Sequence, residues 1–278
     1  MTVPTATSIR ALLAEHGAAP SRALGQHFLA DPNTARRIVR LADLGAGGRV
    51  LEIGPGVGSL TAALLEADAV VTALELDRHV LPLLAAVVDG TGRAERVRVV
   101  QGDALTVDLV ELVGPEPISC VSNLPYNVAT PIVMRLLDEV PQVQRLLVMV
   151  QREVGDRMAA TVGGREYGAV SVKIAYHGVA RVVGSVAPSV FLPPPRVDSA
   201  LVRIDRHASP TVDVPSRDAL FSLVQAGFAQ RRKMLRRALV PHLGDRTVPV
   251  LEAAGVDPAA RAETLDLAAW AALARAAA

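Results

Sequence analysis

Aromatic residues and cysteine are scarce in this chain of 278 residues, which has four Phe, three Tyr, one Trp and a single Cys. One cysteine excludes an internal disulfide and a metal cluster built on several thiolates, as is usual for proteins of the reducing cytosol. We therefore expect a cytoplasmic protein without a metal site. Because aromatic side chains are so few, each one beside a polar motif is a candidate for a specific role in binding.

The chain also lacks long apolar runs and an excess of charge of either sign. No uninterrupted apolar stretch reaches the roughly 18 to 20 residues that a membrane-spanning helix needs. The first 22 residues carry polar and charged side chains throughout, unlike a secretory signal peptide. We expect no membrane partner. Since the net charge is only +1, a nucleic-acid surface would have to come from local clustering of basic residues.

Half of the residues are hydrophobic, which predicts a sizeable core. Strand-like and helical patterns alternate between residues 48 and 206, as in a doubly wound, mostly parallel α/β sheet of Rossmann-like type. The last two strand patterns of this range predict a terminal antiparallel hairpin. Only helical patterns follow. The predicted organisation is N-terminal helices and a lid segment (1–47), an α/β domain (48–206) and a small all-helical domain (207–278).

A strand, a glycine-rich turn and a helix follow one another at residues 49–67, which is the layout of a nucleotide-binding unit. Gly54 and Gly56 allow the backbone to approach a ligand closely. Ser59 stands where the third glycine of the dinucleotide fingerprint would fall, and an acid, Glu52, lies inside the strand. Both details favour S-adenosylmethionine over NAD as the cofactor.

Two acids end the next two predicted strands. Glu75 lies 21 residues after Gly54, where a carboxylate can accept hydrogen bonds from ribose hydroxyls. The alternative is an ordinary solvated acid at a strand end. Asp103 follows the strand at 96–101 and would reach the same edge of the sheet, where it could accept from an adenine amino group.

A polar turn, Asn123-Leu124-Pro125-Tyr126, follows the strand predicted at 118–121. It resembles the Asn-Pro-Pro-Tyr motif of amino methyltransferases, and leucine in second place points to methylation of the exocyclic nitrogen of adenine in RNA. The Asn123 side-chain oxygen and the Leu124 carbonyl would accept the two N–H bonds of that amine. The Tyr126 ring would stack on the unstacked base.

A loop with three consecutive prolines, at residues 189–199, contains Phe191. In a chain so poor in aromatic residues, Phe191 is a candidate for the second wall around the base, opposite Tyr126. The alternative is a core aromatic.

Five basic residues and no acid fall within seven positions of the C-terminal part, in a segment predicted to be helical over 231–240. Such a cluster favours contact with nucleic-acid phosphates, although a solvated basic helix face is the alternative. The five residues are Arg231, Arg232, Lys233, Arg236 and Arg237.

Taken in order, these motifs resemble the ribosomal RNA adenine dimethyltransferase family, whose members have a class I methyltransferase fold. The segment Gly25-Gln26-His27-Phe28-Leu29 completes the series. The resemblance implies that this segment closes over S-adenosylmethionine, with Gln26, His27 and Leu29 as contacts. It further implies Gly54 and Gly56 at the methionine part, Glu75 at the ribose, Asp103 at the adenine and Asn123 near the reacting centre.

The resemblance implies dimethylation at N6 of two adjacent adenines near the 3′ end of 16S rRNA, within the immature 30S subunit, and we expect a monomer. Three alternatives stay open. The first is a relative that methylates 23S rRNA and confers macrolide resistance, and the second is a non-catalytic 30S assembly factor. An NAD oxidoreductase, the third, is disfavoured by Ser59 and by the lack of a plausible hydride-transfer site.

Overall fold

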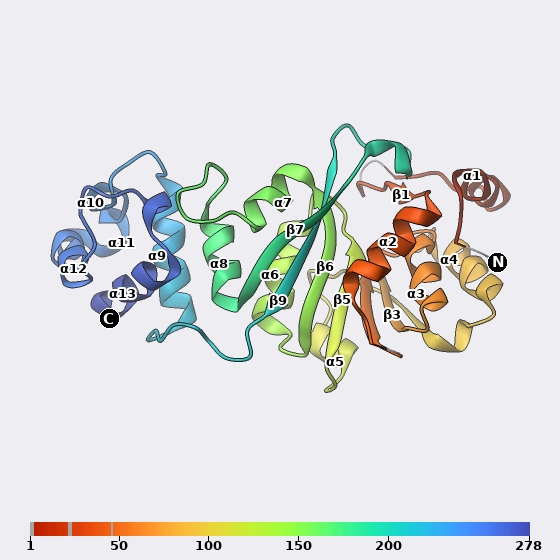
Figure 1. The fold of residues 1–278 in the computed structure, drawn as a ribbon, viewed down its shortest axis with the longest axis horizontal. Helices are drawn as coiled ribbons and strands as arrows, with labels where there is room; N and C mark the ends of the chain where they lie inside the picture. The colour runs from red at the N-terminus through yellow and green to blue at the C-terminus, as the bar shows by residue number, and fades with distance from the viewer. Residues whose placement is uncertain (1–2, 22–23, 46) are drawn as a thin grey trace. The chain divides into compact units, whose positions relative to one another are not determined.

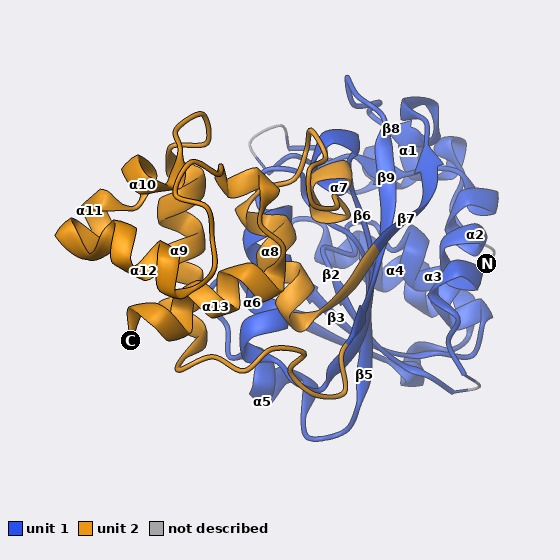
Figure 2. Cartoon of the chain, turned by 60° about the vertical axis from the view of Figure 1, so that its left-hand side comes forward, with its two compact units in different colours: residues 1–155, 181–206 blue, residues 156–180, 207–278 orange. Residues whose placement is uncertain are grey.

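The computed structural model describes residues 3–21, 24–45 and 47–278. These form two compact units (Figure 2). The first comprises residues 1–155 and 181–206, and the second comprises residues 156–180 and 207–278. Figure 1 gives the labels of the helices and strands. In the part of the chain that the structure describes, no helix is long and apolar enough to cross a membrane.

A seven-stranded sheet with the order β4-β3-β2-β5-β6-β9-β7 forms the centre of the first unit. Neighbouring strands from β4 to β6 pair in parallel, and β9 pairs with β6 in the antiparallel sense. The predicted doubly wound, mostly parallel sheet with antiparallel pairing at its end is thereby confirmed. The strands are β2 (Arg49–Ile53), β3 (Val70–Glu75), β4 (Val97–Gln101), β5 (Ile118–Asn123), β6 (Val143–Gln151), β7 (Gly178–Val186) and β9 (Ser199–Arg206).

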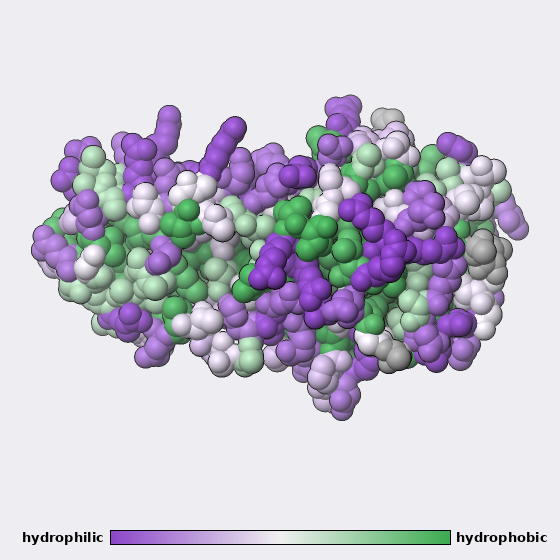
Figure 3. All heavy atoms as spheres, viewed as in Figure 1, coloured by the Kyte–Doolittle hydropathy of each residue, from purple (hydrophilic) through white to green (hydrophobic). Residues whose placement is uncertain are grey.

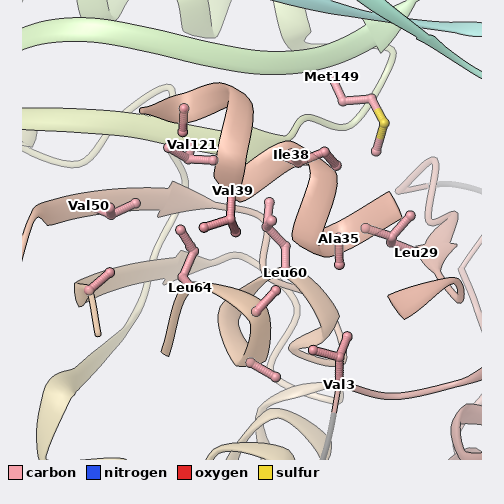
Figure 4. Close-up of a cluster of buried hydrophobic side chains, with 14 of the residues drawn as sticks. Val3, Leu29, Ala35, Ile38, Val39, Val50, Leu60, Leu64, Val121 and Met149 are labelled. Carbon is pink, nitrogen blue, oxygen red and sulfur yellow. The ribbon is translucent and has the colours of Figure 1, made fainter. Parts of the chain in front are cut away.

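Helices pack on this sheet through continuous apolar faces. Ile38 of α2 and Leu64 of α3 lie against Val50 of β2 and Val121 of β5, all in one buried cluster (Figure 4). Removing this apolar surface from water stabilises the layered arrangement. The helices are α1 (Ala6–Glu15), α2 (Pro32–Ala42), α3 (Ser59–Glu66), α4 (Leu81–Thr91), α5 (Leu109–Val113), α6 (Ala129–Glu139) and α7 (Arg152–Met158), the last of which continues into the second unit.

The parallel pairing brings the carboxyl ends of five strands to one edge of the sheet. Backbone bonds continue just past those ends, since Gly54 N–H donates to the Leu74 carbonyl and Gly102 N–H to the Glu75 carbonyl, both at 2.9 Å. Ligands of open α/β sheets bind in the crevice at this edge. The strand-end residues singled out in the sequence therefore come together.

A second, two-stranded sheet joins segments that are far apart in the sequence. β1 (Phe28–Leu29) pairs in the antiparallel sense with β8 (Phe191–Leu192). Ala30 N–H extends the pairing by donating to the Val190 carbonyl at 2.7 Å. The segment predicted to be a lid is thus joined by backbone hydrogen bonds to the proline-rich loop.

The second unit is helical around its own core. Trp270, which is fully buried, Leu220 and Leu223 are at its centre, and Tyr167 and Val172 join them. Residues 156–180 therefore belong to this unit, whereas the sequence had grouped them with the α/β domain. Its helices are α8 (Ala169–His177), α9 (Arg217–Ala229), α10 (Leu235–Ala238), α11 (Val240–Leu243), α12 (Thr247–Ala253) and α13 (Leu267–Ala277).

The prediction of one helix over 231–240 is wrong. Residues 230–234 form a turn, closed by Lys233 N–H donating to the Gln230 carbonyl at 2.7 Å. α10 begins only at Leu235, whose N–H donates to the Ala260 carbonyl at 2.8 Å. Tertiary hydrogen bonds therefore replace the helical ones that this sequence would otherwise form.

Candidate functional site

A pocket of about 160 Å³ lies at the carboxyl edge of the sheet. It brings together every residue predicted to contact the cofactor and all but one of those predicted at the reacting centre. These are Gln26, His27, Leu29, Gly54, Gly56, Glu75, Asp103, Asn123, Leu124 and Tyr126. In the described residues, no group of three or more His, Cys, Asp or Glu side chains is arranged to hold a metal ion.

The Glu75 carboxylate is fixed by the backbone around it. One oxygen accepts from Gly56 N–H and the other from Asp77 N–H, each at 2.9 Å. The side chain is 6% exposed, and burial raises the pKa of Glu75 although these backbone donors oppose the shift. The carboxylate therefore has a set orientation and keeps lone pairs for a pair of hydroxyl donors.

The glycine turn has a backbone conformation that favours glycine at two positions. Gly54 and Gly56 have φ values of 71° and 56°, in the left-handed region. A Cβ atom on Gly56 would lie 2.9 Å from the Phe28 ring, so the lid segment packs directly on this turn. The glycine turn and the lid segment therefore line the same pocket.

Glu52 is a buried acid on the pocket wall. It is 1% exposed, and one of its oxygens accepts from the Thr61 hydroxyl at 2.6 Å. Burial raises the pKa of Glu52 to about 8, with the nearby Glu75 adding to the shift and the Thr61 bond opposing it. At neutral pH the carboxyl group is therefore mainly protonated.

This proton gives a pH dependence with a definite sign. The unfolded chain releases it near the ordinary pKa of 4.5, whereas the folded protein retains it up to about pH 8. The free energy of unfolding should therefore fall as the pH rises through this window, by up to about 1.4 kcal/mol per pH unit from this group. Denaturant unfolding of wild type and Glu52→Gln across the window checks this, since the variant should lose that part of the slope. Identical slopes would contradict it.

Asn123 is oriented by the lid segment. Its side-chain Nδ2 donates to the His27 carbonyl oxygen at 3.2 Å. Because the amide donates on that side, its Oδ1 remains available as an acceptor on the other. Leu124 N–H donates to the Met149 carbonyl at 3.1 Å, which fixes the turn to strand β6.

The His27 ring lies against Tyr126, with ring centroids 5.6 Å apart and 26° between the planes. Its Nδ1 is 2.8 Å from the Pro193 carbonyl oxygen and must carry the hydrogen, because a carbonyl only accepts. The sequence had predicted a contact between His27 and the cofactor. The residue lines the pocket, but its ring also contacts the turn and the proline-rich loop.

Gln26 fastens the lid segment to the end of β3. Its Nε2 donates to the Asp77 carboxylate at 2.8 Å, and its Oε1 accepts from Ser21 N–H at 2.7 Å. The Asp77 carboxylate also accepts from His79 N–H at 3.0 Å. Both ends of the Gln26 amide are thus engaged within the protein.

Phe191 is not brought to the pocket. It is 4% exposed, pairs with Leu29 across the small sheet and packs in the same buried cluster as Ile38 and Met149. The structure therefore favours the core-aromatic alternative over the predicted stacking role. The reason is the β1–β8 pairing, which turns Phe191 inward beneath the lid segment.

The basic cluster divides into two kinds of residue. Arg231 is partly buried, pairs with Glu263 at 2.9 Å and donates to the Arg165 carbonyl. The other four cations, Arg232, Lys233, Arg236 and Arg237, are exposed. Hydrophilic side chains project above the loop that joins α9 to α10 (Figure 3). Arg231 thus contributes to the fold of this unit, and the remaining four are accessible to a polyanion.

One contact at the site involves a residue that was given no role from the sequence. The Ser199 hydroxyl lies 2.7 Å from the Tyr126 hydroxyl. Ser199 follows Asp198 in the proline-rich segment that contributed to the family resemblance, but a serine at a strand start carries no sequence signal for such a contact. Burial raises the pKa of Tyr126, and the bond to Ser199 opposes that shift.

A doubly wound sheet with the antiparallel strand β9, and with a strand-end carboxylate and a glycine turn at one pocket, defines the class of S-adenosylmethionine-dependent methyltransferases. A family model described as ribosomal RNA adenine dimethylase matches residues 19–278. The chain belongs to this family, and it is an rRNA adenine dimethyltransferase that uses S-adenosylmethionine.

Curated relatives match over nearly the whole chain. The ribosomal RNA small subunit methyltransferase A of Leifsonia xyli subsp. xyli is 49% identical over 266 residues, covering 94% of this chain and 93% of the relative. The protein of the same name from Cutibacterium acnes is 46% identical over 272 residues, covering 94% and 89%.

Two solved structures share the fold over most of this chain. A dimethyladenosine transferase from Plasmodium falciparum is 25% identical with a TM-score of 0.76, covering 89% of this chain and 96% of that one. The 23S rRNA methyltransferase ErmE is 27% identical with a TM-score of 0.68, covering 90% and 98%. Structural likeness thus extends to an enzyme whose name gives 23S rRNA as its target.

Proposed function

We propose that the protein dimethylates N6 of two adjacent adenines near the 3′ end of 16S rRNA, acting as a cytoplasmic monomer on the immature 30S subunit. The observation that carries the proposal is the position of the Asn123–Tyr126 turn in the same pocket as Glu75 and the glycine turn. The names of the relatives, which specify the small ribosomal subunit, support the choice of rRNA.

The pocket residues fit the parts of S-adenosylmethionine. Glu75 would accept from the ribose hydroxyls, Asp103 from the adenine amino group, and the backbone at Gly54 and Gly56 would lie along the methionine part. Asp103 has one carboxylate oxygen already accepting from Leu105 N–H at 2.8 Å, which sets its direction. The lid residues Gln26, His27 and Leu29 also line the pocket. When bound, the cofactor supplies an electrophilic methyl group on a sulfonium centre.

The target amine needs orientation more than it needs a base. Its lone pair is delocalised into the purine ring, and two acceptors on its N–H bonds would draw the nitrogen toward tetrahedral geometry. Asn123 and Leu124 line the pocket, and the Asn123 Oδ1 atom and the Leu124 carbonyl would be those acceptors, while Tyr126 would stack on the base. Catalysis would then consist mainly of positioning and electrostatic stabilisation.

The exposed cations of the helical unit are proposed to contact rRNA phosphates. Arg232→Ala/Lys233→Ala should weaken binding to RNA, and the slope of log K against log salt should fall by about 0.7 to 0.9 for each phosphate that the variant no longer neutralises. Filter binding at several salt concentrations measures the RNA affinity and its salt dependence. Arg98→Ala, an exposed arginine on β4, removes a charge elsewhere and serves as the control. A salt slope equal to that of wild type would remove these two residues from the interface.

The proposed substrate can be separated from its nearest rival. Purified protein is incubated with methyl-labelled S-adenosylmethionine and either undermethylated 30S particles or 50S particles. Label in the 30S particles supports the proposal. Label found in 50S particles alone would instead indicate action on 23S rRNA, and binding to 30S without label would indicate an assembly factor.

A further inference from the structure

Tyr126 is held at both ends of its side chain. At the backbone end it belongs to the turn after β5, whose Leu124 N–H is bonded to β6. At the hydroxyl end it meets the Ser199 hydroxyl at 2.7 Å, 73 residues further along the chain. A hydrogen bond between two hydroxyls has a short optimal distance of about 2.7 to 2.8 Å, so this contact has good geometry.

Ser199 itself is immobilised by the sheet. It is fully buried, it is the first residue of β9 and it lies opposite Gln151 of β6. The next backbone bond, from Arg152 N–H to the Asp198 carbonyl at 2.9 Å, continues this pairing. The hydroxyl that contacts Tyr126 is therefore attached to a rigid element and not to a mobile loop.

The two residues differ in their access to a ligand. Tyr126 lines the pocket, whereas Ser199 does not and has no exposed surface. We infer that Ser199 is a positioning residue that fixes the Tyr126 ring as a pre-oriented stacking surface for the target adenine. The inference rests on the proposed function, since it takes a flipped adenine as the ligand of this ring.

The physical basis is the cost of ordering a side chain. A tyrosine held only at its backbone can rotate about its side-chain bonds, and a base that stacks on it must then restrict that rotation. A tyrosine whose hydroxyl is already bonded has lost this freedom before the base arrives. Preorganisation of this kind improves binding of the base without any contact between Ser199 and the substrate.

A double-mutant cycle tests the inference. Tyr126→Phe and Ser199→Ala remove the same bond from opposite sides, and each should lower kcat/KM for undermethylated 30S particles by about threefold to tenfold. The double variant should be no worse than the poorer single variant, because the bond can be removed only once. Affinity for S-adenosylmethionine should stay at the wild-type value. Tyr167→Phe, which removes a buried hydroxyl bond to the Leu265 carbonyl in the other unit, is the matched control.

Two results would overturn the inference. One is kcat/KM at the wild-type level in both single variants, with only thermal stability reduced, which is the pattern of a purely structural bond. The other is a pair of losses that multiply in the double variant. If Ser199→Ala does not fold, Tyr126→Phe still decides, since it preserves the ring and its shape.

A spectroscopic measurement is independent of the RNA substrate. The chain has only three tyrosines, so protein labelled with 3-fluorotyrosine should give three fluorine resonances. Ser199→Ala should shift and broaden the Tyr126 resonance alone, and an unchanged resonance would contradict the proposed anchoring. Wild-type protein that fails to methylate 30S particles would overturn the proposed function, while this measurement would still test the anchoring.

Discussion

Asn123→Ala is expected to reduce methyl transfer to undermethylated 30S particles by about 100- to 1,000-fold, the usual loss when one preorganised polar group is removed from a reacting centre. The Asn123 amide donates to the His27 carbonyl, which leaves its Oδ1 as an acceptor on the pocket side. Alanine removes that acceptor. Single-turnover methylation measures the loss of methyl transfer, and calorimetric titration measures the affinity for S-adenosylmethionine. We expect the first to fall and the second to stay at the wild-type value.

The control for Asn123→Ala is Asn33→Ala, which removes an exposed amide near the start of α2. It should leave both measurements at their wild-type values. Turnover of Asn123→Ala at the wild-type rate would remove Asn123 from the mechanism. A large loss of cofactor affinity would instead assign Asn123 to donor binding.

Glu75→Ala is expected to raise the dissociation constant for S-adenosylmethionine by about 100-fold. Hydrogen bonds to a charged group contribute about 1.5 to 3 kcal/mol each, and two from ribose hydroxyls account for a change of this size. The substitution also removes the acceptor of Gly56 N–H and Asp77 N–H, so the glycine turn loses its fixed geometry. Isothermal titration calorimetry measures the affinity directly.

Glu66→Ala is the matched control for Glu75→Ala. Glu66 pairs with Arg36 at 2.8 Å, but both side chains are more than a third exposed, so the pair contributes little. The variant should bind S-adenosylmethionine as wild type does. Equal affinity in Glu75→Ala and wild type would show that this carboxylate does not contact the ribose.

The sequence was sufficient to predict the sheet and the convergence of the strand-end residues. Glu75 and Asn123 end the strands β3 and β5, and Asp103 follows the exposed strand β4, so the order of the elements brings all three to the edge where the carboxyl ends of parallel strands meet. That argument needs only the order of the elements. It therefore succeeds without knowledge of any individual long-range contact.

The features that the sequence did not predict depend on individual long-range contacts. β1 and β8 have two residues each, too few for a hydrophobic period, yet their pairing buries Phe191 and anchors the lid segment. The basic run at 231–237 has good helix formers, but bonds from Leu235 and Arg236 to the loop at 258–260 end the helical continuity. In both places tertiary hydrogen bonds decide the outcome over local preference.

The boundary between the two units also depends on long-range contacts that the sequence does not reveal. Residues 156–180 contain the end of α7, a loop, α8 and the start of β7, and this order of elements gives no indication of the core they join. Tyr167 and Val172 pack with Trp270, about a hundred residues away in the sequence. Composition alone cannot reveal that partnership, because Ala and Val are abundant in both units.

The most direct test of the central proposal is to map the methylated nucleotides by mass spectrometry after incubation with S-adenosylmethionine and undermethylated 30S particles. The predicted result is N6,N6-dimethyladenine at two adjacent positions near the 3′ end of 16S rRNA. Modification at any other site, or no modification of 16S rRNA by an enzyme that binds the cofactor, would contradict it.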